Sequence, residues 1–389
     1  VISRTSAMQY QKSNKTLKTI GDELGVDYVL EGSIRWSHSA NESKVRITPQ
    51  LVRVNDDTQI WSDSYDRIIN DVFQVQSDIA QSVITQLGIT LLEPQKATLT
   101  KAPTQNVEAY QYYLRGHELV FASTYDLGIF NEAIQHYENA LRLDPDFAAA
   151  QAELAITHLS VFHEGYDTSP ERLQIAKNMI DKAMKTAPNL PIAKVALGFY
   201  HYFGFRNYDL ALQQFHSALS AEPNNTYTMG SIAFVERRQG KFEDSIKHFK
   251  KAIELDPRNA DMYGEIGSTL SRMRCYRDAE TYYDKAIQLA PQLVYTYGMK
   301  RRNILLWKGD LIECRKILES MPQKELAFYN LFWLCQEIAE RKYEAALDHL
   351  NRITIEVFQE EAYFTPRSLM RADILSYMKK DSLARSEYE

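Results

Sequence analysis

Two places in the chain hold residue types that could support chemistry. His163 and Glu164 are adjacent and could act as a base and an acid, and Glu31 lies in a largely apolar run where a carboxylate could be buried. Adjacent residues rarely point in the same direction, so we interpret His163-Glu164 as part of a solvated loop.

Sequence motifs of catalysis are absent. The chain contains neither GxxxxGK[S/T] nor GxGxxG, the glycine-rich loops that bind phosphates, and it contains no HExxH, CxxC or GxSxG. We interpret Tyr65-Asp66-Arg67 as hydrogen-bonding and ion-pairing residues at the rim of a strand. We therefore predict no catalytic residue, no metal-binding residue and no cofactor.

Charge and hydropathy argue against a general nucleic-acid binder and against a bilayer-spanning segment in this sequence. Of the 389 residues, 44% are apolar and 25% are charged, and the net charge of −6 has the wrong sign for a general nucleic-acid binder. No apolar run approaches the ~18 residues that span a bilayer. The three cysteines have no metal-motif spacing, and we interpret them as small core residues. The chain opens abruptly at Val1, and we expect it to be a piece of a longer protein.

The stretch Asp256-Pro257-Arg258 belongs to a repeat. Similar stretches end in Pro145, Pro188, Pro223, Pro257 and Pro291, with spacings of 43, 35, 34 and 34 residues. A fixed period in this range is typical of stacked helical repeats. A proline disfavours helical geometry in the residue before it, so we interpret Asp256-Pro257 as the end of one helix and the turn into the next unit.

Each repeat unit contains two amphipathic helices, exemplified by residues 226–239 and 242–255, with Gly240 between them. A small residue stands five positions before each proline and a large one eight positions before it, which suits close helix packing. The small residues are Ala140, Ala183, Ala218, Ala252 and Ala286, and the large ones are Tyr137, Ile180, Phe215, Phe249 and Tyr283.

This period and pattern resemble tetratricopeptide (TPR) repeats. The resemblance covers residues 105–389 and implies seven to eight units, the last one truncated, in an all-α superhelix whose first helices (A helices) line the concave side. Helix B of the sixth unit is short, and residues 346–358 resemble a seventh helix B.

Aromatic and arginine residues recur on the predicted A helices, and such residues often dominate interface energy. We predict a peptide-binding groove for a protein or peptide with apolar and acidic residues. The alternative is that the aromatic rings pack between helices and the arginines are solvated. The predicted groove residues are Phe199, Tyr202, Tyr227, Phe234, Arg237, Arg238, Arg272, Tyr295 and Arg302.

Residues 1–95 do not follow the repeat. We predict a short strand at residues 1–6, a helix at 14–25, and strands at 26–36, 44–54 and 59–67, followed by a long helix at 72–91. Three antiparallel strands flanked by helices form a small α+β domain. The predicted fold class is therefore α+β at the N-terminus followed by a TPR superhelix.

The runs GVDYVLEGSIRW, ITPQLVRV and IWSDSYDR resemble the TolB-like domain that precedes TPR arrays in many bacterial signalling proteins. The resemblance implies that Glu31 is a structural strand residue, and that an output module such as a nucleotide cyclase, a Ser/Thr kinase or a winged-helix domain lies upstream, often beyond a membrane span. An extracytoplasmic location is then favoured over a cytoplasmic one. The family domain starts one strand and one helix earlier, so the sheet should lack a strand or be completed by something else.

Three functional hypotheses follow. The first is a non-enzymatic sensory or scaffolding region that binds a protein or peptide but no nucleic acid. The second is the regulatory part of a cyclase or kinase whose catalytic domain lies upstream. The third is a structural dimerisation module, in which the groove is filled by the C-terminal helix of the array or by a second copy.

Overall fold

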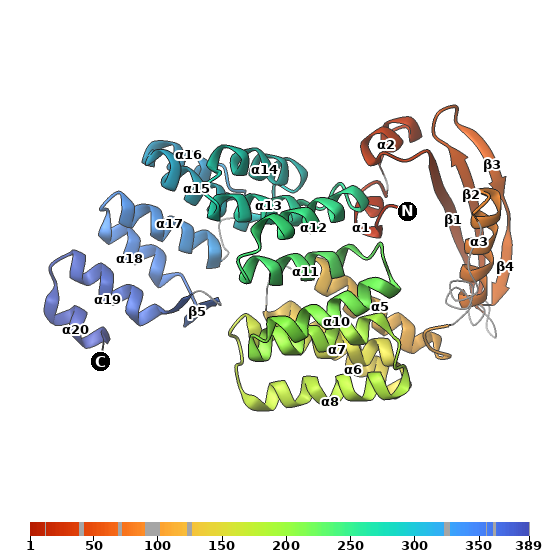
Figure 1. Ribbon diagram of the computed structural model, residues 1–389, viewed down its shortest axis with the longest axis horizontal. Coiled ribbons are helices and arrows are strands. Elements are labelled where there is room, and N and C mark those ends of the chain that lie inside the picture. Colours follow the sequence, from red (N-terminus) through yellow and green to blue (C-terminus); the bar gives the residue numbers. More distant parts are fainter. Residues whose placement is uncertain are drawn as a thin grey trace.

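A computed structural model describes residues 1–11, 13–38, 43–68, 72–89, 102–122, 127–322, 327–354, 356–360 and 363–388. A small sheet domain lies at one end of the molecule, and a curved array of paired helices forms the rest (Figure 1). The predicted combination of an α+β domain and a TPR-like superhelix is therefore confirmed. The predicted boundary at residue 95 lies outside the described residues.

In its described residues, the front domain contains three helices and one antiparallel sheet. Its elements are α1 (Arg4–Met8), α2 (Leu17–Leu24), β1 (Tyr28–His38), β2 (Ser43–Arg53), β3 (Thr58–Ser62), β4 (Tyr65–Ile68) and α3 (Val72–Gln86). The Thr16 hydroxyl accepts a hydrogen bond from the amide of Thr19 at the start of α2, and Gly25 ends the helix in the left-handed conformation.

β2 is the central strand of the sheet, with β1 on one side and both β3 and β4 on the other. The predicted third strand is thus two short strands, because the chain leaves the ladder at Asp63 and Ser64. Helix α3 packs against β3 and β4 (Figure 1). Its Val75 is fully buried, and Leu51 and Tyr65 of the sheet are nearly so. This apolar layer is the core of the domain.

The predicted strand at residues 1–6 is wrong, because residues 4–8 form the short helix α1. The Ser3 hydroxyl accepts a hydrogen bond from the amide of Ser6 and caps the helix. The β-branched residues of VISRTS suggested a strand, but local capping and contacts with the distant array decide the conformation.

The array is built from consecutive helix pairs. They are α5 (Val107–Ala122) with α6 (Leu127–Leu143), α7 (Ala148–His163) with α8 (Pro170–Thr186), α9 (Pro191–Phe199) with α10 (Tyr208–Ala221), α11 (Thr226–Arg238) with α12 (Phe242–Leu255), α13 (Ala260–Arg272) with α14 (Tyr276–Leu289), α15 (Val294–Lys308) with α16 (Leu311–Glu319), α17 (Ala327–Ala339) with α18 (Tyr343–Asn351), and α19 (Arg367–Tyr377) with α20 (Asp381–Tyr388). The short helix B of the sixth unit is confirmed.

Small residues opposite large ones set the spacing within each pair. The alanines five positions before the prolines are at most 1% exposed, as are the large residues eight positions before them. A methyl group on Gly198 would come within 2.4 Å of Phe215, and one on Gly267 within 2.8 Å of Tyr283. The glycine on helix A thus makes room for the aromatic ring on helix B.

Two segments depart from the regular repeat. A π-helix, η2 (Tyr200–Gly204), extends α9, and such turns are frequent at functional sites. The predicted seventh helix B at 346–358 is too long. Helix α18 ends at Asn351, and the chain then forms a hairpin of β5 (Val357–Glu360) and β6 (Tyr363–Pro366).

Candidate partner-binding surface

The predicted groove residues lie on or directly after the A helices α9, α11, α13 and α15, but their exposure differs. Phe199 is 5% exposed and Tyr202 is 3% exposed, so both belong to the core. The Phe199 ring packs edge-on against Phe215 and lies 5.8 Å from the ring of Tyr227. Burial raises the pKa of Tyr227, and the negative charge of Glu153 raises it further. These rings thus pack against one another between the helices.

Arg237 is engaged by the chain itself. Its guanidinium lies 2.5 Å from a carboxylate oxygen of Glu265 on α13 and 5.3 Å from the centre of the half-buried Phe234 ring. The side chain is only 8% exposed. The charge of Arg237, one of the four arginines predicted for the groove, is therefore neutralised across the α11–α13 contact.

Arg238 lies at the end of α11 beside the π-helix. Its Nε donates a hydrogen bond to the hydroxyl of Tyr202 at 3.4 Å. The His163 ring stacks on Phe203, with centroids 3.9 Å apart and planes inclined by 13°. Burial lowers the pKa of His163 to about 4, and Arg238 and Arg206 contribute to that shift. His163 is thus a packed aromatic group, and the prediction that it lies in a solvated loop is wrong.

The three predicted residues on α13 and α15 are at least partly exposed. Arg272 and Arg302 are exposed, and Tyr295 is half-buried with its ring edge-on to Phe328. Asp261, in the first turn of α13, adds an acid to the same surface. Desolvation by the surrounding protein raises the pKa of Asp261 to about 6 although the residue is exposed, and the neighbouring Glu265 raises it as well. The surface therefore carries both signs of charge, and the role of the nine groove residues in binding stays a prediction.

An acid–imidazole pair on the first two A helices went unnoticed in the sequence. His117 Nδ1 lies 3.2 Å from Oε1 of Glu153, which is 4% exposed. In the sequence, this pair is indicated only by the position of Glu153, an acidic residue inside the alanine-rich run AAAQAELAITHL of α7. Burial raises the pKa of Tyr113 and Tyr137, and the negative charge of Glu153 raises it further.

The other residues singled out in the sequence have structural positions. Glu31 is an exposed strand residue that accepts a hydrogen bond from Gln50 Nε2. Asp66 forms an ion pair with Arg46 across the sheet, 2.6 Å apart. Cys314 is buried, whereas Cys275 and Cys335 are exposed, so the prediction of three core cysteines holds only for Cys314.

The Asp256-Pro257-Arg258 turn is more than the end of a helix, because α1 of the front domain docks on it. The Ser3 amide donates to the carbonyl of Leu255 at 2.8 Å. The Ser6 hydroxyl donates to Asp256 Oδ1 at 2.5 Å and accepts from the Arg258 amide at 2.9 Å. Ser6 is fully buried, and Asp256 is 1% exposed. We call this set of contacts the α1 clasp.

The Arg258 side chain extends the α1 clasp toward α2. Its Nε donates to Gln9 Oε1 at 2.7 Å, and its NH1 donates to the Tyr10 hydroxyl at 3.2 Å. The guanidinium also lies over the Tyr10 ring, 5.2 Å from its centre, and 3.4 Å from Glu23. Hydrogen bonds from Lys15 and Tyr10 lower the pKa of Glu23. The front domain and the array are thus joined by a polar contact at the turn between α12 and α13.

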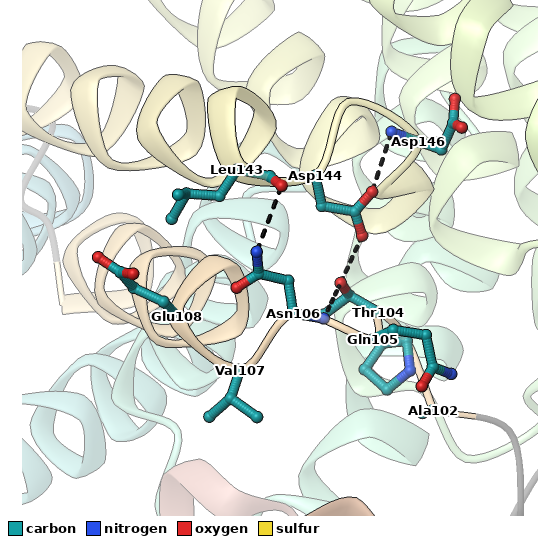
Figure 2. Close-up of a pocket in the computed structure, with 10 residues that line it drawn as sticks. Ala102, Thr104, Gln105, Asn106, Val107, Glu108, Leu143, Asp144 and Asp146 are labelled. Carbon is teal, nitrogen blue, oxygen red and sulfur yellow. Dashed lines mark hydrogen bonds between the residues drawn. The ribbon is translucent and has the colours of Figure 1, made fainter. Parts of the chain in front are cut away.

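A second Asp-Pro turn binds the segment that leads into the array. The Thr104 hydroxyl donates to the carboxylate of Asp144, and Asn106 Nδ2 donates to the carbonyl of Leu143 at 3.3 Å (Figure 2). These residues line an open pocket of about 890 Å³ that also includes Asp146 and Glu108. Asp precedes proline at Pro145 and Pro257, whereas Ala, Glu and Ala precede Pro188, Pro223 and Pro291. At both Asp-Pro turns the aspartate carboxylate accepts a hydrogen bond from a hydroxyl group, Ser6 at Asp256 and Thr104 at Asp144. Each hydroxyl belongs to a segment outside the helix pair that contains the turn.

Two kinds of feature were not found in the part of the chain that the structure describes. No group of three or more His, Cys, Asp or Glu side chains is arranged to hold a metal ion there. Within the same residues, no helix has the length and apolar character needed to cross a membrane.

The fold and the helix packing define a TPR-like helical superhelix preceded by a small α+β domain. The family described as Regulator of microtubule dynamics protein 1-3 matches residues 122–294, which is less than half of the chain. The chain is 28% identical over 192 residues to "Putative adenylate cyclase 3" of Rhizobium meliloti (strain 1021), a match that covers 49% of this chain and 32% of the relative. The matched part thus spans about a third of that relative's length.

The solved structures that match this chain include the following two. The human IFIT1 dimer with m7Gppp-AAAA matches 81% of this chain and 76% of its own, with 15% identity and a TM-score of 0.54. TTC0263, a thermophilic TPR protein of Thermus thermophilus, matches 51% of this chain and 99% of its own, with 17% identity and a TM-score of 0.43. At these identities the likeness concerns the fold alone.

Proposed function

We propose that this chain is a non-enzymatic scaffolding region of a signalling protein, in which the A helices bind a protein or peptide and the α1 clasp connects that event to the front domain. Repeat arrays suit this task because each unit contacts only its neighbours, so a bound segment can change the curvature of the whole array. An extracytoplasmic location stays a prediction.

One observation carries this proposal: helix α13 belongs to both the clasp and the binding surface. Its N-cap Asn259 accepts from the Met262 amide and donates to Asp256, the acceptor of Ser6. Farther along the same helix, Glu265 binds Arg237 of α11. A partner that competes for Arg237 or Glu265 would shift α13 against α11, and the start of α13 would move relative to α1.

The exposed arginines allow a test of binding that leaves the fold intact. Anisotropy of fluorescent peptides from a library with acidic and apolar residues would measure affinity for the full chain. Arg302→Glu should weaken binding of the selected peptides about tenfold, because a charge-assisted hydrogen bond becomes a repulsion. Arg277→Glu, at a position on helix B that is also exposed, is the matched control. Equal effects of both substitutions would contradict binding on the A helices.

A second candidate function is the regulatory region of a nucleotide cyclase. It rests on the similarity over 192 residues to the relative named as a putative adenylate cyclase. Cyclic AMP formation by the full-length parent protein, with and without Ser6→Ala, tests this candidate. A parent that forms cyclic AMP at a rate that depends on Ser6 would support it, and a parent with no such activity would contradict it.

A further inference from the structure

Strand β1 is a long, regular and unpaired edge. It pairs with β2 over eleven consecutive residue pairs without a bulge, and in the described residues no strand pairs with its other side. The strand contains no proline and no lysine, the residues that commonly protect sheet edges. Its free backbone groups are therefore ready to accept another strand.

One face of β1 is apolar and uncovered. Tyr28, Leu30 and Ile34 point to the same side because side chains alternate along a strand, and they are 39%, 49% and 60% exposed. Their neighbour Leu51 on β2 is 2% exposed, because α3 packs on the β3 and β4 side of the sheet. The apolar layer of the domain thus continues beyond the part that α3 covers.

The other face of β1 carries opposite charges on either side of Ser33. Glu31 and Arg35 are both exposed, and Arg35 stands opposite Arg46 of β2. Arg46 is neutralised by Asp66, whereas no carboxylate among the described residues lies within ion-pair distance of Arg35. Like charges directly opposite each other destabilise a sheet. An acidic residue on a strand paired with the open edge of β1 would therefore stabilise Arg35.

From this arrangement we propose that β1 pairs antiparallel with β1 of a second copy of this chain, about a two-fold axis through Ser33. In that register Glu31 lies opposite the partner's Arg35 and Arg35 opposite the partner's Glu31, so two ion pairs form. Ile34 then lies opposite Gly32, which has no side chain, and the exposed apolar strips of the two copies adjoin.

The charges select this register among the possible ones. A two-fold axis through residue 31 or 35 would place like charges opposite each other. An axis through residue 32 or 34 would place Glu31 opposite a serine and leave both charges unpaired. The contact is confined to one strand edge and the residues beside it, so the dimer should be reversible and concentration-dependent.

Charge reversal gives a direct test by sedimentation equilibrium of the full chain. The wild type should show a monomer–dimer equilibrium. Arg35→Glu and Glu31→Arg alone should each raise the dissociation constant about tenfold, and the double variant should restore it, because both ion pairs return in reversed polarity. Lys18→Glu, an exposed reversal in the same domain, is the control and should leave the equilibrium unchanged.

A second measurement separates association from folding. Arg35→Glu places an acid beside Arg46 within the monomer, so its thermal stability at low concentration should not fall. A wild type that is monomeric at all concentrations would overturn the proposal. A dimer that is indifferent to the single reversals, or that the double variant fails to restore, would overturn it as well.

Discussion

The hydroxyl of Ser6 donates a hydrogen bond to the carboxylate of Asp256, 250 positions later in the chain, and both groups are buried. This bond links a five-residue helix at the N-terminus to a turn in the middle of the array. The same hydroxyl accepts from the Arg258 amide, so one side chain satisfies two buried groups of the turn.

Removal of this hydroxyl should open the α1 clasp. Ser6→Ala leaves the Asp256 carboxylate and the Arg258 amide each short of one partner, which should cost about 1–3 kcal/mol of docking free energy. Hydrogen exchange of residues 1–11 should then accelerate while exchange in α7 stays unchanged. Ser64→Ala, at an exposed serine of the same domain, is the control. Unaltered exchange of residues 1–11 in Ser6→Ala would show that the hydroxyl does not hold α1.

Two glycines on A helices should respond to alanine in opposite ways. Gly198→Ala places a methyl group within 2.4 Å of the buried Phe215 ring and should lower stability by about 1–3 kcal/mol. At Gly264, within α13, the nearest atom to the new methyl would be 3.7 Å away, so alanine should stabilise the helix by up to about 1 kcal/mol. Thermal unfolding of both variants measures the difference. Equal destabilisation would contradict the glycine–aromatic packing.

The buried Arg237 and the exposed Arg302 should contribute very differently to the free energy of unfolding. Glu265→Ala would leave the Arg237 guanidinium buried without its carboxylate, and we expect a loss of about 3–5 kcal/mol in the free energy of unfolding. Arg302→Ala, at an exposed position, should stay within about 0.5 kcal/mol of the wild type. Urea unfolding of the two variants measures both free energies. A similarly small loss of unfolding free energy in both variants would mean that Glu265 does not hold Arg237.

The free energy of unfolding should fall as the pH is lowered, because the imidazole of His163 is buried. Burial lowers the pKa of His163 to about 4 from its usual 6.5, so the unfolded chain takes up the proton first as the pH falls. This contribution to stability is therefore complete above pH 6.5 and is lost between pH 6.5 and about 4, with an order of magnitude of about 1–3 kcal/mol.

The variant His163→Gln isolates that contribution. The difference in unfolding free energy between wild type and variant should shrink from about pH 7 to about pH 4.5, as measured with urea at both values. Asp261 acts in the opposite sense, because its raised pKa of about 6 makes the folded state take up a proton first. A difference between wild type and variant that does not change with pH would contradict the burial of His163.

The repeat architecture was predictable because it depends on local and periodic signals. Ala218, Phe215 and Pro223 stand at fixed offsets, and each reports on packing within one helix pair. The fate of Arg237 was not predictable in this way. Its partner Glu265 lies 28 residues on, and nothing local distinguishes an arginine that faces a partner from one that pairs with the next A helix.

The α1 clasp was beyond sequence reasoning for a similar reason. Ser6 lies in a run of β-branched and polar residues that suggested a strand, and its acceptor Asp256 looked like part of a helix stop. A contact 250 residues apart between two common residue types leaves no periodic trace. The aspartate before the proline was the one available signal, and it recurs at Asp144, where Thr104 docks.

The distance between the front domain and the array is the most direct measure of how the clasp couples them. One spin label would be attached to Gln59→Cys of β3 and one to the exposed Cys275, with Cys335→Ser to remove the other exposed thiol. Pulsed electron paramagnetic resonance would then measure the distance between the two labels. The closed clasp predicts a single narrow distance distribution that broadens in Ser6→Ala. An equally narrow and unshifted distribution in Ser6→Ala would contradict a clasp that positions the front domain.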